Sequence, residues 1–240
     1  MQNRIDWLFM QAPGSTNLPD FGPPDYGAPN LHGPCMLSKV TGPYGASSST
    51  KVTVVKVLQG SYYMPGRADM ATQIMDDIHS KGLEGRAIIV ESGSRTIANP
   101  ATDATPQHPS TPEWVNQYNE YQMVLGGTIL PGTSWDHLHQ IYSMMVSIGA
   151  VLFMAAGNDE AGSPYINSIP QMWCDTIPCL NVGATDKTGN RARWSFALPN
   201  PSYPNAGVTL WAPGDEIQCI GYYGATGTQY IIQDGTSFGK

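Results

Sequence analysis

Short runs of apolar, β-branched residues alternate along this chain with longer segments whose apolar positions recur at helical spacing. The run Val52–Leu58 is almost wholly apolar, which is typical of a strand buried on both faces. Residues 66–81 follow with a helical pattern that stops at Gly82, and residues 87–90 form a second apolar run. Strand, helix and strand within about forty residues make a βαβ unit, which predicts a parallel sheet.

The alternation continues toward the C-terminus and predicts two more helices and four more strands. The helices fall at residues 113–126 and 135–148, and residues 150–155 show the clearest strand pattern of the chain. The remaining strands are predicted at residues 180–183, 208–211 and 230–232.

Two segments interrupt this pattern. Residues 11–34 are rich in Pro, Gly, Asn and Asp, which indicates a loop. The segment 95–134 begins with a polar, Pro-rich stretch and is predicted to be an insertion, because loops of that length are functional or disordered more often than structural. The predicted organisation is one α/β domain over residues 1–240, carrying this insertion.

Composition and charge argue against nucleic acids and membranes as binding partners. The 12 basic residues are outnumbered by 19 acidic ones, which gives a net charge of −7, so we expect no nucleic-acid partner. A hydrophobic content of 41% is enough for a packed core. The longest apolar run, Ile148–Gly157, reaches about half a membrane span, and the chain start shows no signal-peptide core. We therefore expect no membrane insertion.

The four cysteines leave the redox compartment open. No Cys-x-x-Cys spacing occurs among Cys35, Cys174, Cys179 and Cys219. Cys174 and Cys179 flank a turn that contains Pro178 and could form a disulfide. Isolated buried thiols are an equal alternative.

A carboxamide stands at the carboxyl end of the clearest strand. The strand 150–155 runs into Ala155-Ala-Gly-Asn158, and ligands of open α/β sheets bind at such ends. The Asn158 amide could donate a hydrogen bond to a developing oxyanion. The alternative is an asparagine that satisfies its own turn.

A serine between small residues lies near the C-terminus. Gly235-Thr-Ser237-Phe-Gly239 could expose Ser237 as a nucleophile, and it also matches the G-x-S-x-G elbow of α/β-hydrolases. That match fails on order, because the elbow fold places its acid and histidine after the serine. Gly132-Thr-Ser134 has similar composition but precedes a predicted helix, so we expect Ser134 to be an N-cap.

A histidine after the first loop completes a set of three groups. His32 could act as a general base if a serine approaches it. His32-Gly-Pro-Cys35, followed by Ser38-Lys39 and Gly42, resembles the H-G-T-x-x-[AS] motif of subtilisin-like serine proteases. Ala155–Asn158 is similar to the oxyanion-hole segment of that family, and Gly235-Thr-Ser237 to its G-T-S-x-[AS] nucleophile motif.

Two more stretches lie between these last motifs in the family order. Asn181-Val-Gly-Ala-Thr-Asp186 resembles the V-G-A-x-D strand end, and Trp211-Ala-Pro-Gly214 resembles the A-P-G turn. The resemblance covers roughly residues 25–240 and points to the subtilases (peptidase family S8). The cysteine near the histidine resembles the fungal, proteinase K-like branch.

The resemblance implies a fold, an activity and residue roles. The fold is a three-layer α/β domain with a mostly parallel sheet. The activity is that of a serine endopeptidase in which Ser237 attacks the scissile carbonyl, His32 carries the proton and Asn158 holds the oxyanion. Ser92, Gly93 and Ser94 resemble the edge segment that pairs with an extended substrate backbone. The partners are then polypeptide substrates, and the parent protein is an extracellular monomer.

No cofactor follows from these motifs, although family resemblance makes calcium possible. His137 and His139 are spaced i, i+2, which points them apart on a helix, so no zinc pair is expected.

Several residues depart from the family pattern. The D-[ST]-G motif of the catalytic acid is not found; Asp6 precedes His32 but has Trp7 where Ser or Thr is required. Gly239 stands in place of Ala or Ser, and Pro34 in place of Thr. The family also continues past its serine into a long helix. We therefore expect a fold incomplete at both termini, with little or no hydrolysis by residues 1–240 alone, and the alternative is a non-catalytic, protein-binding pseudo-protease.

Overall fold

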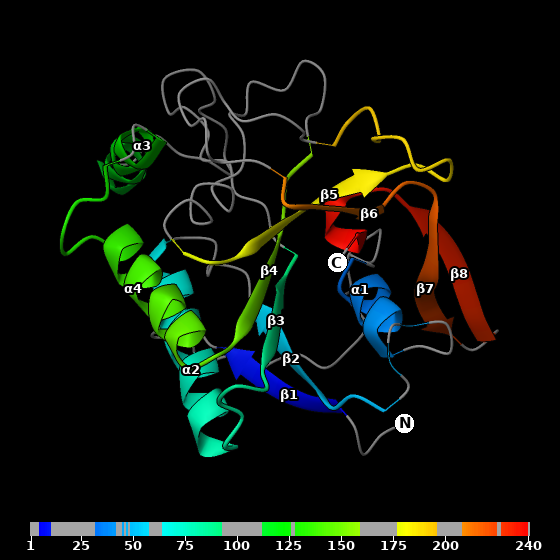
Figure 1. The fold of residues 1–240 in the computed structure, drawn as a ribbon, viewed down its shortest axis with the longest axis horizontal. Coiled ribbons are helices and arrows are strands. Elements are labelled where there is room, and N and C mark those ends of the chain that lie inside the picture. Colours follow the sequence, from blue (N-terminus) through cyan, green and yellow to red (C-terminus); the bar gives the residue numbers. More distant parts are fainter. Residues whose placement is uncertain are drawn as a thin grey trace.

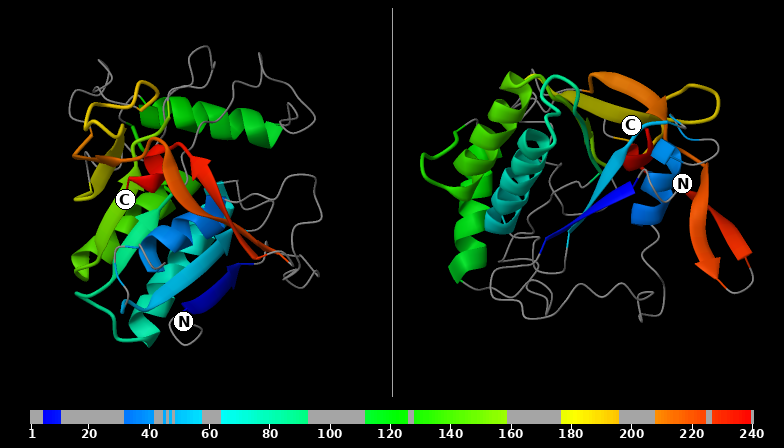
Figure 2. Two further views of the ribbon diagram at one scale, coloured as in Figure 1. Left: turned by 90° about the vertical axis from the view of Figure 1, so that its right-hand side faces the viewer. Right: turned by 90° about the horizontal axis from the view of Figure 1, so that it is seen from below.

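The computed structural model describes residues 5–10, 32–41, 45, 47, 49–57, 64–92, 112–125, 128–158, 177–195, 208–224 and 227–239. Its elements in chain order are β1 (Ile5–Met10), α1 (His32–Thr41), β2 (Val52–Val57), α2 (Met64–Ser80), β3 (Ile88–Glu91), α3 (Pro112–Leu125), α4 (Ser134–Ser147), β4 (Val151–Ala155), β5 (Leu180–Thr185), β6 (Leu210–Pro213), β7 (Ile217–Gly224), β8 (Gly227–Gln233) and the 3₁₀ helix η2 (Thr236–Phe238). Strands form a middle layer, with α2 and α4 on one side and α1 on the other (Figures 1 and 2). The predicted α/β class with a mostly parallel sheet is confirmed.

Two groups of parallel strands make up the middle layer. β3, β4, β5 and β6 are neighbours in that order, with Ile88 opposite Val151 and Val182 opposite Leu210. β1 and β2 form a separate parallel pair. The predicted order strand, helix, strand is confirmed for β2, α2 and β3, but β2 and β3 belong to different sheets. Because the four strands β3–β6 are parallel, their carboxyl ends lie along one edge, which is where open α/β sheets bind ligands.

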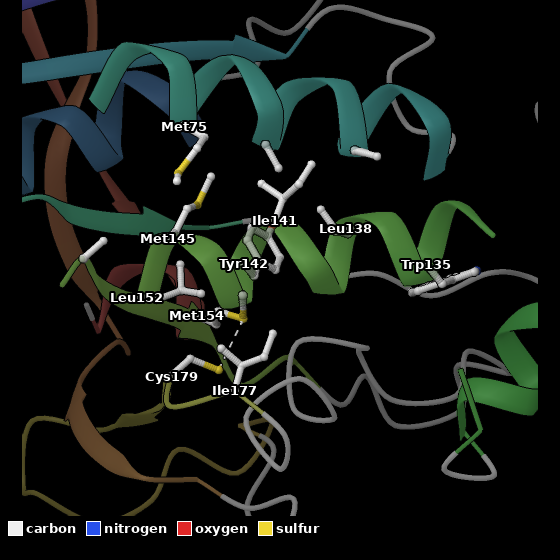
Figure 3. Close-up of a cluster of buried hydrophobic side chains, with 13 residues drawn as sticks. Met75, Trp135, Leu138, Ile141, Tyr142, Met145, Leu152, Met154, Ile177 and Cys179 are labelled. Atoms are coloured by element: carbon white, nitrogen blue, oxygen red, sulfur yellow. Dashed lines mark hydrogen bonds between the residues drawn. The ribbon is translucent and has the colours of Figure 1, made fainter. Parts of the chain in front are cut away.

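The main hydrophobic core lies between the sheet and the helix pair α2 and α4 (Figure 3). The buried face of α4 has the i, i+3, i+4, i+7 spacing that its periodicity predicts: Leu138, Ile141, Tyr142 and Met145. These side chains pack in one cluster with Leu152 and Met154 of β4. Each buried CH₂ group contributes about 0.8 kcal/mol, so this face holds α4 against the sheet.

A second, smaller core lies between α1, the β7–β8 hairpin and η2. It contains Cys35, Cys219 and Phe238. Cys35 and Cys219 form a disulfide with their Cα atoms 5.0 Å apart, so the alternative of isolated thiols is wrong for this pair. Cys179 is disulfide-bonded as well, and Cys174 lies outside the described residues.

The ends and edges of the fold differ from the sequence expectations. The pattern predicts no strand at β1, where polar Asp6 interrupts an apolar run, or at β7, which contains Gly221 and Gly224. β7 pairs antiparallel with β8, so the strand expected near residues 230–232 belongs to a hairpin outside the parallel sheet. The N-cap of α4 is Thr133 rather than Ser134, because the Thr133 side chain accepts a hydrogen bond from the Asp136 backbone N–H.

The predicted insertion at 95–134 is regular in part, since α3 occupies residues 112–125. Residues 93–111, like most of the predicted loop at 11–34, lie outside the described part of the chain. None of the described helices combines the length and the apolar character needed to span a bilayer.

Candidate active site

The predicted site residues that the structure describes in full converge at the carboxyl ends of β3 and β4. Ser92 directly follows β3, and Asn158 follows β4 after a turn at Gly157, whose φ of 103° suits glycine. Ser237 is the central residue of η2. The Ser237 hydroxyl donates a hydrogen bond of 2.8 Å to the Ser92 carbonyl oxygen, although 145 residues separate the two. The fold thus brings together three groups that the sequence places far apart.

The Asn158 amide is held in one orientation by Thr236. Its Oδ1 atom accepts hydrogen bonds of 3.0 Å from both the backbone N–H and the hydroxyl of Thr236. Thr236 Oγ1 in turn accepts from the Gly157 N–H at 3.1 Å. Because Oδ1 is occupied, Nδ2 is the donor that remains, and it lies on the side of Gly235, where an added Cβ would be 3.6 Å away. No role for Thr236 follows from the sequence pattern; its position beside Ser237 in the G-T-S motif is the signal that could have marked it.

Replacement of Thr236 tests the hydrogen bonds that join Thr236, Asn158 and Gly157. Thr236→Val keeps the shape but leaves the Gly157 N–H unpaired in a place where Thr236 itself is 1% exposed. We expect a loss of about 1–3 kcal/mol in the free energy of unfolding, measured by urea denaturation. Thr236→Ser retains the hydroxyl and is the matched control. Equal stability of the Val and Ser variants would contradict the assigned hydrogen bonds.

Backbone contacts with neighbouring strands hold the Ser237 segment in place. The Gly235 N–H donates to the Gly214 carbonyl at 2.9 Å, just after β6. A Cβ at Gly214 would lie 2.7 Å from the Gly235 oxygen, so this approach requires glycine. At Gly239 a Cβ would lie 3.2 Å from the carbonyl oxygens of Gly183 and Ala212. That tight space gives a physical reason for glycine where the family pattern has Ala or Ser.

Ser237, the central residue of η2, is 8% exposed. The first N–H bonded within this turn is that of Phe238, which donates to the Gly235 carbonyl at 3.0 Å, while the Thr236 N–H is used by Asn158. Among the hydrogen bonds of the described residues, none engages the Ser237 N–H. Among the described residues, neither the Ser237 N–H nor Asn158 Nδ2 has an assigned acceptor, so both could donate to an oxyanion.

The end of β3 is anchored from the helix layer. The buried Tyr142 hydroxyl of α4 donates to the Glu91 carboxylate, one residue before Ser92. This bond fixes the strand end whose carbonyl meets Ser237. Gly93 and Ser94, the other two residues predicted to bind substrate, lie outside the described residues.

The backbone of His32 lies at the start of α1. This helix packs against η2 and β7 through Cys35, Cys219 and Phe238. The described structure thus brings the helix that carries His32 next to the turn that carries Ser237, as Figure 1 shows for α1 and the C-terminus.

Asp6 lies in the β1–β2 pair, which is separate from the four-stranded group. β1 is parallel to β2, and Asp6 pairs with Thr53 near the amino ends of both strands. At about 3.3 Å per residue, Asp6 lies roughly 13 Å before the carboxyl end of β1 at Met10. The site lies at the carboxyl ends of β3 and β4, which belong to a different sheet from β1.

The remaining titratable groups form no metal centre in the described part of the chain, where no group of three or more His, Cys, Asp or Glu side chains could hold an ion. Burial lowers the pKa of His139 below its usual value, with Asp136 partly opposing the shift. His137 is exposed.

No family model and no curated protein matches this sequence, whereas solved structures do. The PatG macrocyclase in complex with peptide aligns with a TM-score of 0.55 and 14% identity over 98% of this chain. The S393A mutant of the epidermin leader peptide processing serine protease EpiP from Staphylococcus aureus aligns with a TM-score of 0.53 and 15% identity over 87%. The prenylagaramide maturation protease PagA aligns with a TM-score of 0.50 and 18% identity over 98%.

The fold is subtilisin-like. At such identities the likeness concerns the fold alone, and activity does not follow from it. The chain covers 65%, 49% and 64% of these three structures, so it spans about half to two thirds of their length. The subtilisin-like fold nevertheless agrees with the order of the five motifs along the sequence.

Proposed function

We propose that this protein is a serine endopeptidase that hydrolyses peptide bonds through an acyl-enzyme. Ser237 is the nucleophile, His32 the general base and Asn158 the oxyanion donor. The observation that supports this best is the convergence of Ser92, Asn158 and Ser237 at the carboxyl ends of two neighbouring parallel strands. A turn that only satisfied its own backbone would not need partners 78 and 145 residues away.

In this mechanism the Ser237 Oγ forms a bond to the scissile carbonyl carbon while its proton passes to His32. His32 then gives that proton to the leaving amine, and water repeats the sequence to release the acyl group. The carbonyl oxygen becomes an oxyanion between Asn158 Nδ2 and the Ser237 N–H. Before attack, the Ser237 hydroxyl has to turn away from the Ser92 carbonyl, where it rests in this structure.

The substrate class proposed is an extended polypeptide. β3 is the outermost strand of the four-stranded group, and edge strands accept a further strand through main-chain hydrogen bonds. Ser92 directly follows this strand, and we propose that Ser92, Gly93 and Ser94 pair with the substrate backbone. Such pairing reads main chain more than side chains, which implies broad cleavage. Among the structures with this fold, the PatG macrocyclase is in complex with peptide and EpiP processes a leader peptide.

The carboxylate that orients His32 is not identified among the described residues. Asp6 lies before the carboxyl end of β1 in the separate β1–β2 pair, and its neighbours do not match the D-[ST]-G pattern. We propose that the acid comes from a part of the protein outside the described residues. Without such a partner, turnover in the analogous protease case falls about 10⁴-fold.

A fluorophosphonate probe tests this proposal. The serine oxygen displaces fluoride from phosphorus, so only an activated serine is labelled. We expect labelling of the wild type and none of Ser237→Ala. Ser134→Ala is the matched control, because Gly132-Thr-Ser134 repeats the Gly-Thr-Ser sequence at the start of α4; it should label like the wild type. A folded wild type without labelling, or labelling that survives Ser237→Ala, would overturn the assignment.

A non-catalytic, protein-binding pseudo-protease is the second candidate. It is favoured by the hydrogen bond that the Ser237 hydroxyl donates to the Ser92 backbone carbonyl. It predicts that the folded protein binds extended peptides but is not labelled by the probe.

The compartment proposed is extracellular or otherwise oxidising. Cys35, Cys179 and Cys219 are all disulfide-bonded, and such bonds persist outside reducing cytosol. We also propose a monomer and a place in the fungal, proteinase K-like branch. The branch assignment rests only on the position of Cys35 near His32.

A further inference from the structure

The Cys35–Cys219 disulfide joins two segments that are 184 residues apart. Cys35 lies in α1 and Cys219 in β7, and both are buried, at 0% and 3% exposure. Phe238 of η2 packs in the same cluster, with Met36, Ile217 and Ile231 around it. The bond is the covalent link between α1 and the β7–β8 hairpin.

Both candidate catalytic residues lie within a few residues of this link. His32 begins α1, and Cys35 follows three residues later, which is about 4.5 Å along a helix axis. On the other side, Ser237 directly precedes Phe238, whose buried ring packs in the cluster formed by the disulfide. The disulfide is therefore close in sequence to His32 through α1, and it packs against Phe238, the residue after Ser237.

We propose that the Cys35–Cys219 disulfide is a positioning device that sets the separation between His32 and Ser237. This inference rests on the roles assigned under the proposed function. Van der Waals packing alone would let α1 slide against the hairpin, whereas a disulfide fixes the two Cα atoms at 5.0 Å. A misplacement of about 1 Å in a catalytic group can lower the rate about 10²-fold, so a small slide of α1 matters.

The disulfide is removed with Cys35→Ala/Cys219→Ala, and Cys35→Ala/Cys219→Val is a second variant that fills more of the vacated space. Leu152→Ala is the matched control: it opens a cavity in the main core, whose cluster of buried residues is separate from that of Cys35, Cys219 and Phe238. All proteins are compared at a temperature well below the Tm of each. A change in the position of His32 relative to Ser237 is thereby distinguished from a loss of folded protein.

The first measurement does not depend on enzymatic activity. The His32 imidazole is titrated by NMR in proteins that carry Ser237 and in the same proteins with Ser237→Ala. We expect Ser237→Ala to shift the His32 pKa in the disulfide-bonded protein and in Leu152→Ala. We expect no such shift in either disulfide-free variant. The same Ser237-dependent shift with and without the disulfide would overturn the proposal, as would no shift in the wild type.

The second readout is peptide hydrolysis. We expect kcat to fall about 10²-fold in the disulfide-free variants with KM within about twofold, and Leu152→Ala to keep the wild-type kcat. An unchanged kcat with a lowered Tm would mean that the disulfide only stabilises the fold. If the wild type hydrolyses nothing while the disulfide-dependent His32 shift is present, the proposed function fails and the positioning role stands.

Discussion

Ser237→Ala is expected to lower kcat for peptide hydrolysis more than any other single change. In subtilisin, which has this constellation of groups, loss of the serine costs about 10⁶-fold in kcat. If no carboxylate orients His32, the wild-type kcat is already about 10⁴-fold lower than that of an enzyme with the complete triad. Ser237→Ala could then lower kcat by only about 10²-fold more. The measurement is kcat on an internally quenched peptide.

The size of the Ser237→Ala effect therefore reports on the missing acid. A loss near 10⁶-fold would show that a carboxylate outside the described residues serves His32, and a loss near 10²-fold would show that none does. Ser134→Ala, in the second Gly-Thr-Ser sequence, should leave kcat unchanged. A Ser237→Ala protein that keeps the wild-type rate would remove Ser237 from the mechanism.

Asn158→Asp is expected to give the second largest loss. Asp keeps an Oδ1 acceptor for both Thr236 hydrogen bonds and replaces only the Nδ2 donor. Removal of one such oxyanion donor costs about 10²–10³-fold in kcat, a magnitude known from subtilisin itself, and the added negative charge acts in the same direction. KM should change little, because the donor acts on charge that develops only in the transition state.

Asn158→Ala serves as the comparison for that variant. It removes the donor and also leaves the buried Thr236 hydroxyl and N–H without their acceptor. Both variants should have a lowered kcat. Only Asn158→Ala should also lower the free energy of unfolding, by about 1–3 kcal/mol. Wild-type kcat in Asn158→Asp would contradict the oxyanion role.

The sequence was enough to predict the parallel sheet and the helices that cover it. Buried strands such as Val151–Ala155 and the helical face Leu138 to Met145 carry strong periodic signals, because one element buries one face. Asn158 and Ser237 could be predicted as site residues because each stands in a short, specific motif, Ala155-Ala-Gly-Asn158 and Gly235-Thr-Ser237.

Contacts between distant segments could not be predicted in the same way. The Ser237–Ser92 hydrogen bond uses a backbone carbonyl, which every residue has, so no residue type marks it. The pairing of Cys35 with Cys219 depends on how α1 meets the hairpin, and spacing alone favours no partner. β7 was missed because Gly221 and Gly224 weaken its pattern, although its pairing with β8 compensates.

The most direct test of the account is a crystal structure of the protein with a peptide aldehyde bound, because the hemiacetal mimics the tetrahedral intermediate. The account predicts a covalent bond from Ser237 Oγ to the aldehyde carbon, with the former aldehyde oxygen about 2.7–3.1 Å from Asn158 Nδ2 and from the Ser237 N–H. It also predicts that the peptide backbone pairs with Ser92. An aldehyde bound elsewhere, or one whose oxygen points away from Asn158, would contradict the account.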